Sequence, residues 1–119
     1  MLDHVTIAVS DFTRSREFYD AALAPLGIFR LYADGDHAAG YGSGSKAIFW
    51  IAEQVRTPGQ AHIAFKARQP TDIQAFYAAA LAHGGRDNGP PGTRPQYHDR
   101  YYAAFVIDPD GYNIEAVIQ

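Results

Sequence analysis

Residues 101–119, YYAAFVIDPDGYNIEAVIQ, carry the clearest strand pattern in the chain. On both sides of Asp108-Pro109-Asp110-Gly111, the side chains alternate between two faces as they do along a strand. The four residues between are typical of a tight turn, because Pro presets φ and Gly tolerates a positive φ. Glu115 lies in the middle of the second predicted strand, where burying a carboxylate is costly unless a partner or a metal ion pairs with it. A solvent-facing Glu on a half-exposed strand is the alternative.

The composition is that of one globular domain and excludes several classes of function. The 119 residues are enough to bury a core, and 47% of them are hydrophobic. A formal charge of −3 without a basic run gives no indication of nucleic-acid binding. Because the chain has no cysteine, disulfides, thiolate nucleophiles and cysteine-based metal sites are excluded. No run has membrane-spanning length and no signal-peptide pattern is visible, so we expect a cytoplasmic protein without a membrane partner.

The first half of the chain predicts a strand, a helix and three further strands. Residues 2–9 alternate as a strand, and the helix after them is predicted to be capped by Asp11 or Thr13 and to end at Gly27. Its apolar stripe, at helical spacing, is Ser15, Phe18, Tyr19, Ala22, Leu23 and Leu26. Glycine-containing turns then separate three strand-like runs, at residues 28–33, 37–41 and 46–52.

The second half repeats the first. His62 stands 58 positions after His4, and the same offset aligns the first strand and helix of both halves without a gap. The matched pairs are Val5/Ile63, Ile7/Phe65, Phe18/Phe76, Tyr19/Tyr77, Ala22/Ala80, Leu23/Leu81 and Gly27/Gly85. The second helix is predicted to start at Pro70, with Thr71 as its cap. Such self-similarity indicates a duplicated unit, so we predict one α+β domain of two βαβββ modules, about 1–57 and about 58–119.

One segment breaks the repeat. Residues 86–100 are rich in Gly, Pro and polar residues. If Gly44 and Gly111 are equivalent turn glycines, their offset is 67 instead of 58, which assigns nine extra residues to this segment. A loop of this length in a small domain is usually functional or disordered, so we expect a long loop here.

Period-two alternation places His4, His62 and Glu115 on the same side of the predicted sheets. The more apolar residues that alternate with them are predicted to pack beneath the helices, which leaves these three on the opposite face. Two imidazoles and one carboxylate can hold a divalent metal ion and leave coordination positions open for water or a substrate oxygen. The alternative is that each histidine is structural. We expect a metal site, with Fe, Mn, Zn, Ni or Co as the ion.

The whole chain resembles the vicinal oxygen chelate superfamily, which includes glyoxalases, bleomycin-resistance proteins and extradiol dioxygenases. The matching runs are LDHVTIAVSDFTRSREFYDAALAPLG, HIAF and DPDGYNIEA. The resemblance implies paired βαβββ modules that form a U-shaped cleft of mixed sheets around a divalent metal. It matches His4, His62 and Glu115 to the metal ligands of the family. It also agrees with a homodimer, which we expect because curved sheets leave edges to cover.

Two departures from family patterns matter. Glyoxalase I has a fourth, carboxylate ligand on the last strand of its first module, and the turn-glycine register puts Ile48 there, with Trp50 near and Glu53 beyond the strand. A glyoxalase I site is therefore incomplete. The tail also resembles the extradiol dioxygenase signature, in which a His and a Tyr precede the Asp-Pro-x-Gly turn and the Glu. His98 fits that signature, but Phe105 stands where the Tyr belongs.

Residues 86–100 are predicted to form a lid over the open metal positions, with a surface loop or a dimer contact as the alternative. Acid–base or hydrogen-bonding roles in catalysis, beside Glu115, are expected for His98, Tyr101 and Tyr102. Substrate binding is expected for Trp50, Arg94, Tyr97 and Arg100.

Two functions remain open. The first is a metal-dependent lyase, isomerase or dioxygenase that acts on a small oxygenated substrate, and the predicted metal site favours it. The second is a metal-free protein of the bleomycin-resistance kind, which would bind a drug or metabolite by stacking it on aromatic side chains.

Overall fold

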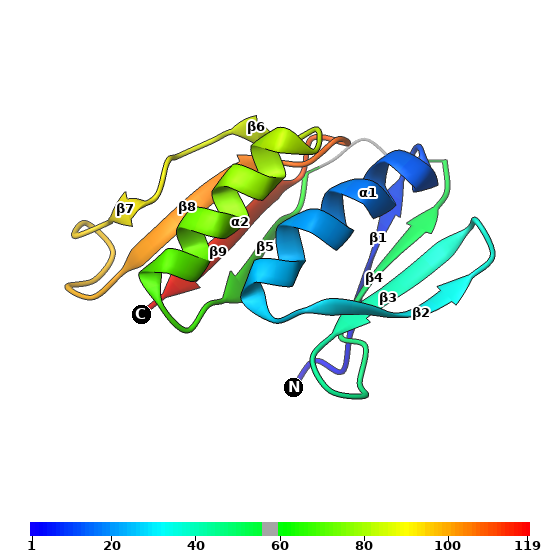
Figure 1. Ribbon diagram of the computed structural model, residues 1–119, viewed down its shortest axis with the longest axis horizontal. Coiled ribbons are helices and arrows are strands. Elements are labelled where there is room, and N and C mark those ends of the chain that lie inside the picture. The colour runs from blue at the N-terminus through cyan, green and yellow to red at the C-terminus, as the bar shows by residue number, and fades with distance from the viewer. Residues whose placement is uncertain (56–59) are drawn as a thin grey trace.

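The computed structural model describes residues 1–55 and 60–119 and contains two modules of similar order (Figure 1). The first module contains β1 (Val5–Val9), α1 (Phe12–Leu23), the short 3-10 helix η1 (Ala24–Leu26), β2 (Phe29–Asp34), β3 (Ala38–Gly42) and β4 (Phe49–Glu53). The second contains β5 (His62–Lys66), α2 (Pro70–Ala82), β6 (Arg86–Asp87), β7 (Gly92–Thr93), β8 (Tyr102–Ile107) and β9 (Asn113–Ile118). The predicted α+β class is confirmed, whereas the predicted boundary between residues 57 and 58 lies outside the described residues.

Each module builds its own sheet with the same path of strands. The first sheet has the order β1-β4-β3-β2, and the second has β5-β9-β8-β6 with β7 also paired to β8. The first strand of each module pairs in parallel with the last strand of that module, β1 with β4 and β5 with β9. All the other strand pairs among the described residues are antiparallel. β1 and β5 are therefore edge strands of their sheets. The helices lie on the same side of the two sheets and pack against each other (Figure 1).

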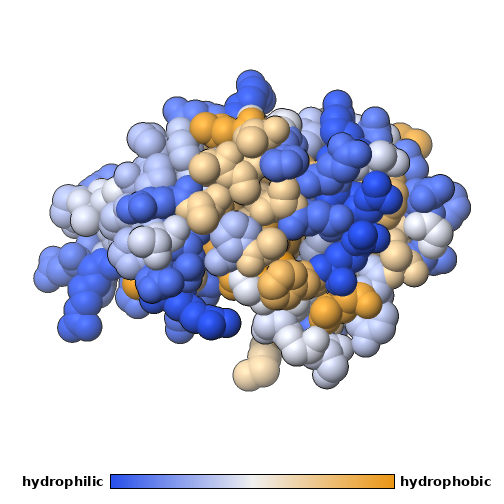
Figure 2. Space-filling view, viewed as in Figure 1, coloured by the Kyte–Doolittle hydropathy of each residue, from blue (hydrophilic) through white to orange (hydrophobic). Residues whose placement is uncertain are grey.

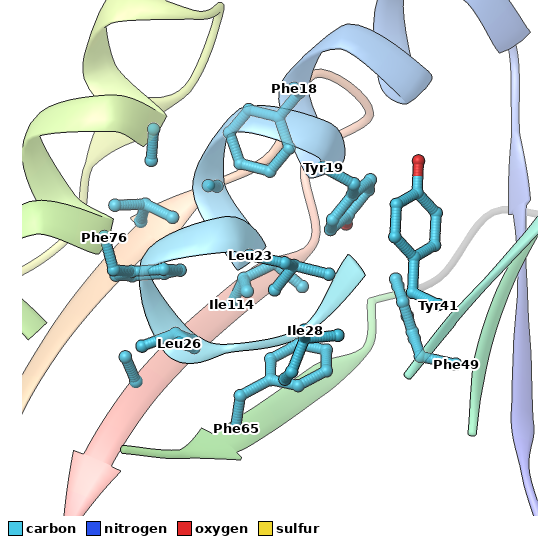
Figure 3. Close-up of a cluster of buried hydrophobic side chains, with 14 of the residues drawn as sticks. Phe18, Tyr19, Leu23, Leu26, Ile28, Tyr41, Phe49, Phe65, Phe76 and Ile114 are labelled. Carbon is cyan, nitrogen blue, oxygen red and sulfur yellow. The ribbon is translucent and has the colours of Figure 1, made fainter. Parts of the chain in front are cut away.

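The helices cover a single core that runs through both modules (Figure 3). Phe49 of the first sheet meets Phe65 of the second edge to face, with ring centroids 5.2 Å apart. Phe18 and Phe76, which the repeat predicted as equivalent core residues, are both fully buried. The repeat matches Leu81 to the buried Leu23 and so predicts a core position for it as well, but Leu81 is 38% exposed, so that expectation was wrong.

The helix ends show which local signals were correctly interpreted. Asp11 caps α1, since its side chain accepts a hydrogen bond from the Arg14 backbone N–H at 3.1 Å. Gly27 closes the following 3-10 turn with φ 75°, a conformation that glycine adopts without strain. Thr71 does not cap α2: the N-cap is Gln69, which makes no capping hydrogen bond through its side chain, and Pro70 occupies the first turn.

The turn between β8 and β9 ties the second module to the first. Asp108 is 2% exposed and accepts hydrogen bonds from the Tyr19 hydroxyl at 2.5 Å and from the Tyr112 backbone N–H at 2.9 Å. Asp110 accepts from the Ser10 hydroxyl at 2.6 Å and from the Ser10 backbone N–H. Burial raises the pKa of Asp108 although these hydrogen bonds oppose that shift. The two aspartates of the predicted turn, Asp108 and Asp110, thus also hold the second module against the first.

Residues 86–100 are not one continuous loop, so that expectation was wrong in part. Arg86–Asp87 and Gly92–Thr93 form short strands against β8, and the Asn88 backbone N–H donates to the Phe105 carbonyl at 2.9 Å. A long polar segment next to a strand satisfies its backbone groups by pairing wherever it can. After Thr93 the segment makes local backbone hydrogen bonds, from the Arg94 N–H to the Tyr101 carbonyl at 2.7 Å and from the Tyr97 N–H to the Arg94 carbonyl at 3.0 Å.

The outer surface of α2 is more apolar toward its C-terminal end than that of α1, which is polar (Figure 2). Exposed residues on α2 include Ala75, Ala78 and Leu81, whereas α1 exposes Thr13, Arg14 and Glu17. In the described ranges 1–55 and 60–119, no helix is long and apolar enough to cross a membrane.

Candidate functional site

The candidate site lies on the face of the second sheet that points away from the helices. Ile114 and Ala116 of β9 are buried beneath the helices, so alternation turns Glu115 to the opposite face, as predicted. The strand register puts Glu115 between Ala64 of β5 and Phe105 of β8. Glu115 is nevertheless only 1% exposed, so a carboxylate is buried on a sheet face.

Two neighbours satisfy this carboxylate. His62 Nε2 lies 2.8 Å from Glu115 Oε1, which makes a hydrogen bond when the ring carries its hydrogen on Nε2. The hydroxyl of Tyr101 donates to Glu115 Oε2. A buried carboxylate is tolerable only with such partners, so the contacts explain why Glu115 does not need solvent. The His62 side chain is 53% exposed and gives the pair access to solvent.

Tyr101 is held as a hydrogen-bond donor. Burial, followed by the hydrogen bond to Glu115, raises the pKa of Tyr101 to about 12. The phenol therefore keeps its proton at neutral pH. Its ring meets that of Tyr97 edge to face, with centroids 5.1 Å apart.

A cavity of about 450 Å³ opens above the His62–Glu115 pair. Its aromatic walls are Tyr97, Tyr101 and Phe105, and Gln119 completes the lining. A mostly aromatic cavity with a few convergent polar groups is the usual form of a small-molecule site. Gln119 was not predicted, although it shares the alternation of Glu115 along β9 and the same pattern would have identified it.

The loop residues predicted to bind substrate divide into two groups. Tyr97 lines the cavity. The guanidinium of Arg94 instead donates to the Pro90 carbonyl at 2.7 Å and lies over the Phe105 ring, 5.4 Å from its centroid. Arg94 therefore braces the loop that carries Tyr101, and Arg100 is exposed outside the cavity.

Two of the residues predicted for catalysis point elsewhere. His98 does not line the cavity, and its Nδ1 accepts a hydrogen bond from the Arg100 backbone N–H at 3.0 Å. Tyr102 faces the helix side, where its hydroxyl accepts a hydrogen bond from Gln74 Nε2 at 3.1 Å. Tyr101, and not Tyr102, makes the contact with Glu115.

His4 lies apart from the other two predicted metal ligands. Its Nδ1 is 2.8 Å from Asp3 Oδ1, and its side chain is 51% exposed. It borders a cavity of about 310 Å³ that Ala64 of the second sheet also lines. Within the described part of the chain, no three His, Asp or Glu side chains lie close enough together to hold a metal ion.

The register of the parallel strands corrects one expectation about the first module. Thr6 pairs with Trp50 in β4, just as Ala64, which is 58 positions later, pairs with Glu115 in β9. Trp50 is therefore the counterpart of Glu115, and the expectation of Ile48 at that position was wrong. The turn glycines misled because the connections before β4 and β9 differ in length.

The chemistry of the donor set fits a divalent metal in part. An imidazole nitrogen and a carboxylate oxygen suit Fe, Mn, Zn, Ni or Co, and the cavity leaves room for further ligands. The described residues of one chain bring only two of these donors together, one fewer than the usual three protein ligands of an open site. A bound ion at His62 and Glu115 would need a third ligand from another element or another chain.

Comparison with known proteins identifies the family. The model of the Glyoxalase/Bleomycin resistance protein/Dioxygenase superfamily matches residues 1–116. No curated protein matches the chain. The crystal structure of a glyoxalase/bleomycin resistance protein from Albidiferax ferrireducens T118 is 34% identical with a TM-score of 0.86, and the match covers 100% of this chain and 99% of that one.

Two more distant structures share the fold. A glyoxalase-related enzyme from Fulvimarina pelagi is 18% identical with a TM-score of 0.76, and the match covers 100% of this chain and 88% of that one. A glyoxalase/bleomycin resistance protein/dioxygenase family enzyme from Burkholderia phytofirmans PsJN is 15% identical with a TM-score of 0.73, and the match covers 97% and 95% of the two chains. The chain therefore belongs to the Glyoxalase/Bleomycin resistance protein/Dioxygenase superfamily.

Proposed function

We propose that this protein is a divalent-metal-dependent lyase, isomerase or dioxygenase for a small oxygenated substrate. The observation that supports it is the buried Glu115 carboxylate, held 2.8 Å from His62 beneath an aromatic cavity. A metal ion bound there would act as a Lewis acid on oxygens of the substrate. Buried ionisable groups that face a cavity belong to functional sites more often than ionisable groups elsewhere in a protein do.

The residues of this chain have separate tasks in that function. His62 and Glu115 would hold the ion through Nε2 and Oε1, the two atoms that now face each other. Tyr101 keeps its hydrogen bond to Oε2 and so orients the carboxylate. Tyr97 and Phe105 shape the space for the substrate and exclude water from one side of it.

We propose that a second copy of the chain completes the ligand set with its His4. Among the described residues, β1 and β5 are edge strands of their sheets, His4 directly precedes β1, and His62 begins β5. Exposed strand edges are covered in stable proteins, and a symmetric dimer covers two at once. His4 of one copy and the His62–Glu115 pair of the other would then form the two-histidine, one-carboxylate site.

The test is metal analysis of protein purified without chelator, combined with light scattering. We expect about one divalent ion for each chain and a dimer, and we expect His4→Ala, His62→Ala and Glu115→Gln each to lose most of the metal. The matched control is His83→Ala, an exposed histidine at the end of α2 that lies outside both cavities. A metal content that none of the three variants lowers would refute the proposed site.

The second candidate function is binding of a drug or metabolite without a metal ion, as a protein of the bleomycin-resistance type would do. It is favoured by one observation: both oxygens of Glu115 already have partners within the chain. Chelator-treated protein that retains full affinity for its ligand, and that carries out no turnover when metal is restored, would favour this function over the enzyme.

A further inference from the structure

A groove between the two modules, here called the inter-module groove, lies at the far end of β5 from the His62–Glu115 pair. Its volume is about 560 Å³, and its lining comes from both modules, with Ile48 from the first and Lys66 from the second. His62 begins β5 and Lys66 ends it, so at about 3.3 Å per residue the two positions are roughly 13 Å apart along the strand. Among the described residues, the groove shares no lining residue with the cavity above Glu115.

The floor of the inter-module groove is apolar. Leu26, Ile28 and Phe65 line it, belong to the same core cluster (Figure 3) and are each at most 9% exposed. Ile48 is 45% exposed and extends this apolar surface toward solvent. A hydrocarbon chain that lay along these side chains would remove apolar surface of both partners from water, which is favourable.

Two cations line the same groove without an anionic partner. Lys66 and Arg68 are exposed, and within residues 1–55 and 60–119 neither side chain makes a hydrogen bond or an ion pair. The described residues that line the groove include no Asp or Glu. The whole chain has a formal charge of −3, so this pair is a local excess of positive charge and not part of a generally basic surface.

Arg68 is placed at the groove by packing and not by an ion pair. A Cβ at Gly27 would lie 3.1 Å from Nη2 of Arg68, so the guanidinium lies close against the backbone at this glycine. Ser10, which stands 58 positions before Arg68, donates to Asp110 and so helps to hold the modules together. Arg68 makes no such contact with the described residues, so its N–H donors are available to a ligand.

We propose that the inter-module groove binds a free medium-chain fatty acid, with its carboxylate at Arg68 and Lys66 and its hydrocarbon chain on the apolar floor. Charge complementarity favours this ligand, because a guanidinium can hold a carboxylate through two parallel hydrogen bonds and the ammonium of Lys66 adds a second positive charge. A volume of about 560 Å³ is in the usual range for a small-molecule site. This site goes beyond the proposed function and requires no metal ion.

The probe is octanoate, titrated into chelator-treated full-length protein and followed by calorimetry. We expect saturable binding of about one octanoate for each chain. Butyrate keeps the carboxylate but has a shorter chain, and octan-1-ol keeps the chain but has no charge, so each should bind at least about tenfold more weakly. If either of these two compounds binds as tightly as octanoate, the proposal is wrong.

Matched variants separate the groove from general effects. Arg68→Gln should weaken octanoate binding by about tenfold and Lys66→Gln by roughly threefold. Ile48→Ser should weaken octanoate but not butyrate, because it alters only the apolar floor. The control is Arg86→Gln, at an exposed arginine on β6 that does not line the groove. Equal losses of affinity in Arg68→Gln and Arg86→Gln would overturn the proposal.

The outcome is independent of the metal test. Glu115→Gln should lose metal and still bind octanoate with wild-type affinity, because Glu115 lies outside the groove. If chelator-treated protein binds octanoate and untreated protein holds no metal, the metal function fails and the groove stands. If octanoate binds only to metal-loaded protein and Glu115→Gln abolishes that binding, the carboxylate is a metal ligand, so the groove proposal fails and the metal function stands.

Discussion

The same row of the two sheets holds opposite chemistry in the two modules. In the first module the row is Thr6, Trp50 and Gly40, and in the second it is Ala64, Glu115 and Phe105. A large ring over a glycine in one module corresponds to a short carboxylate beside a phenylalanine in the other. The two modules thus share the order of their strands. They differ at the equivalent position on the open face, which is apolar in the first module and charged in the second.

The buried tyrosines of the helices test how far the two halves differ in their cores. Tyr19 is fully buried against Phe18 and Phe49 and donates to Asp108, whereas its counterpart Tyr77 is half-buried and donates to the exposed Asp87. We expect Tyr19→Ala to lower the free energy of unfolding by roughly 3–5 kcal/mol, because it leaves a cavity and removes the hydroxyl that donates to Oδ2 of the buried Asp108 carboxyl. Tyr77→Ala should cost less than half as much. Urea denaturation measures both, and equal losses would contradict the asymmetry.

Replacing Trp50 by glutamate, the residue at the equivalent position of the second module, tests whether the two open faces share one metal site. Trp50→Glu puts a carboxylate in the first module where the second has Glu115. If the two open faces share one ion in the dimer, this fourth ligand should tighten metal binding by about tenfold, or roughly 1.4 kcal/mol. Cobalt titration followed by absorbance measures the affinity. Trp50→Gln is the neutral control, and equal affinity in the two variants would show that Trp50 does not face the ion.

The carboxyl that joins the modules should give stability a distinct pH dependence. Burial raises the pKa of Asp108 in the folded state above its ordinary value of 3.8, so the folded protein binds a proton that the unfolded chain has already released. This contribution to stability is fully present below the unfolded-state pKa and is lost as pH rises through the folded-state pKa. Asp108→Asn should abolish that loss in urea titrations from about pH 3 to about pH 7. Asp87→Asn, at the exposed partner of Tyr77, should keep the wild-type profile.

The smallest expected difference concerns the helix starts. Asp11 caps α1, whereas Gln69 at the start of α2 makes no capping hydrogen bond. Asp11→Ala should therefore lower the free energy of unfolding by about 1 kcal/mol, and Gln69→Ser should raise it by roughly 0.5 kcal/mol. Thermal unfolding detects both shifts. Thr13→Ala, inside the first turn of α1, is the control and should leave the melting temperature unchanged.

Much of the fold could be predicted, because its signals act over short distances. Alternation along 113–118 correctly put Glu115 opposite Ile114 and Ala116, and the 58-residue repeat correctly matched Phe18 to Phe76. The cap of α2 failed because Pro70 takes the first helical position and moves the start to Gln69. Ile48 failed because turn glycines report on loop length, whereas strand register depends on hydrogen bonds between distant strands.

The candidate site was less predictable for the same physical reason. The sequence alone determined which residues share a face: two histidines, one carboxylate and the alternating aromatic residues near them. Only the tertiary structure decided that Tyr101 meets Glu115 and that Tyr102 turns to the helices. It also decided that, among the described residues, His4 does not join His62 and Glu115 in one ligand group. Those outcomes depend on how the modules dock, through contacts such as Ser10–Asp110 and Tyr19–Asp108 between residues about a hundred positions apart. The spacing of residues in the sequence determines which side chains share a face of one strand or helix. The packing of one element against another determines which of these faces come into contact.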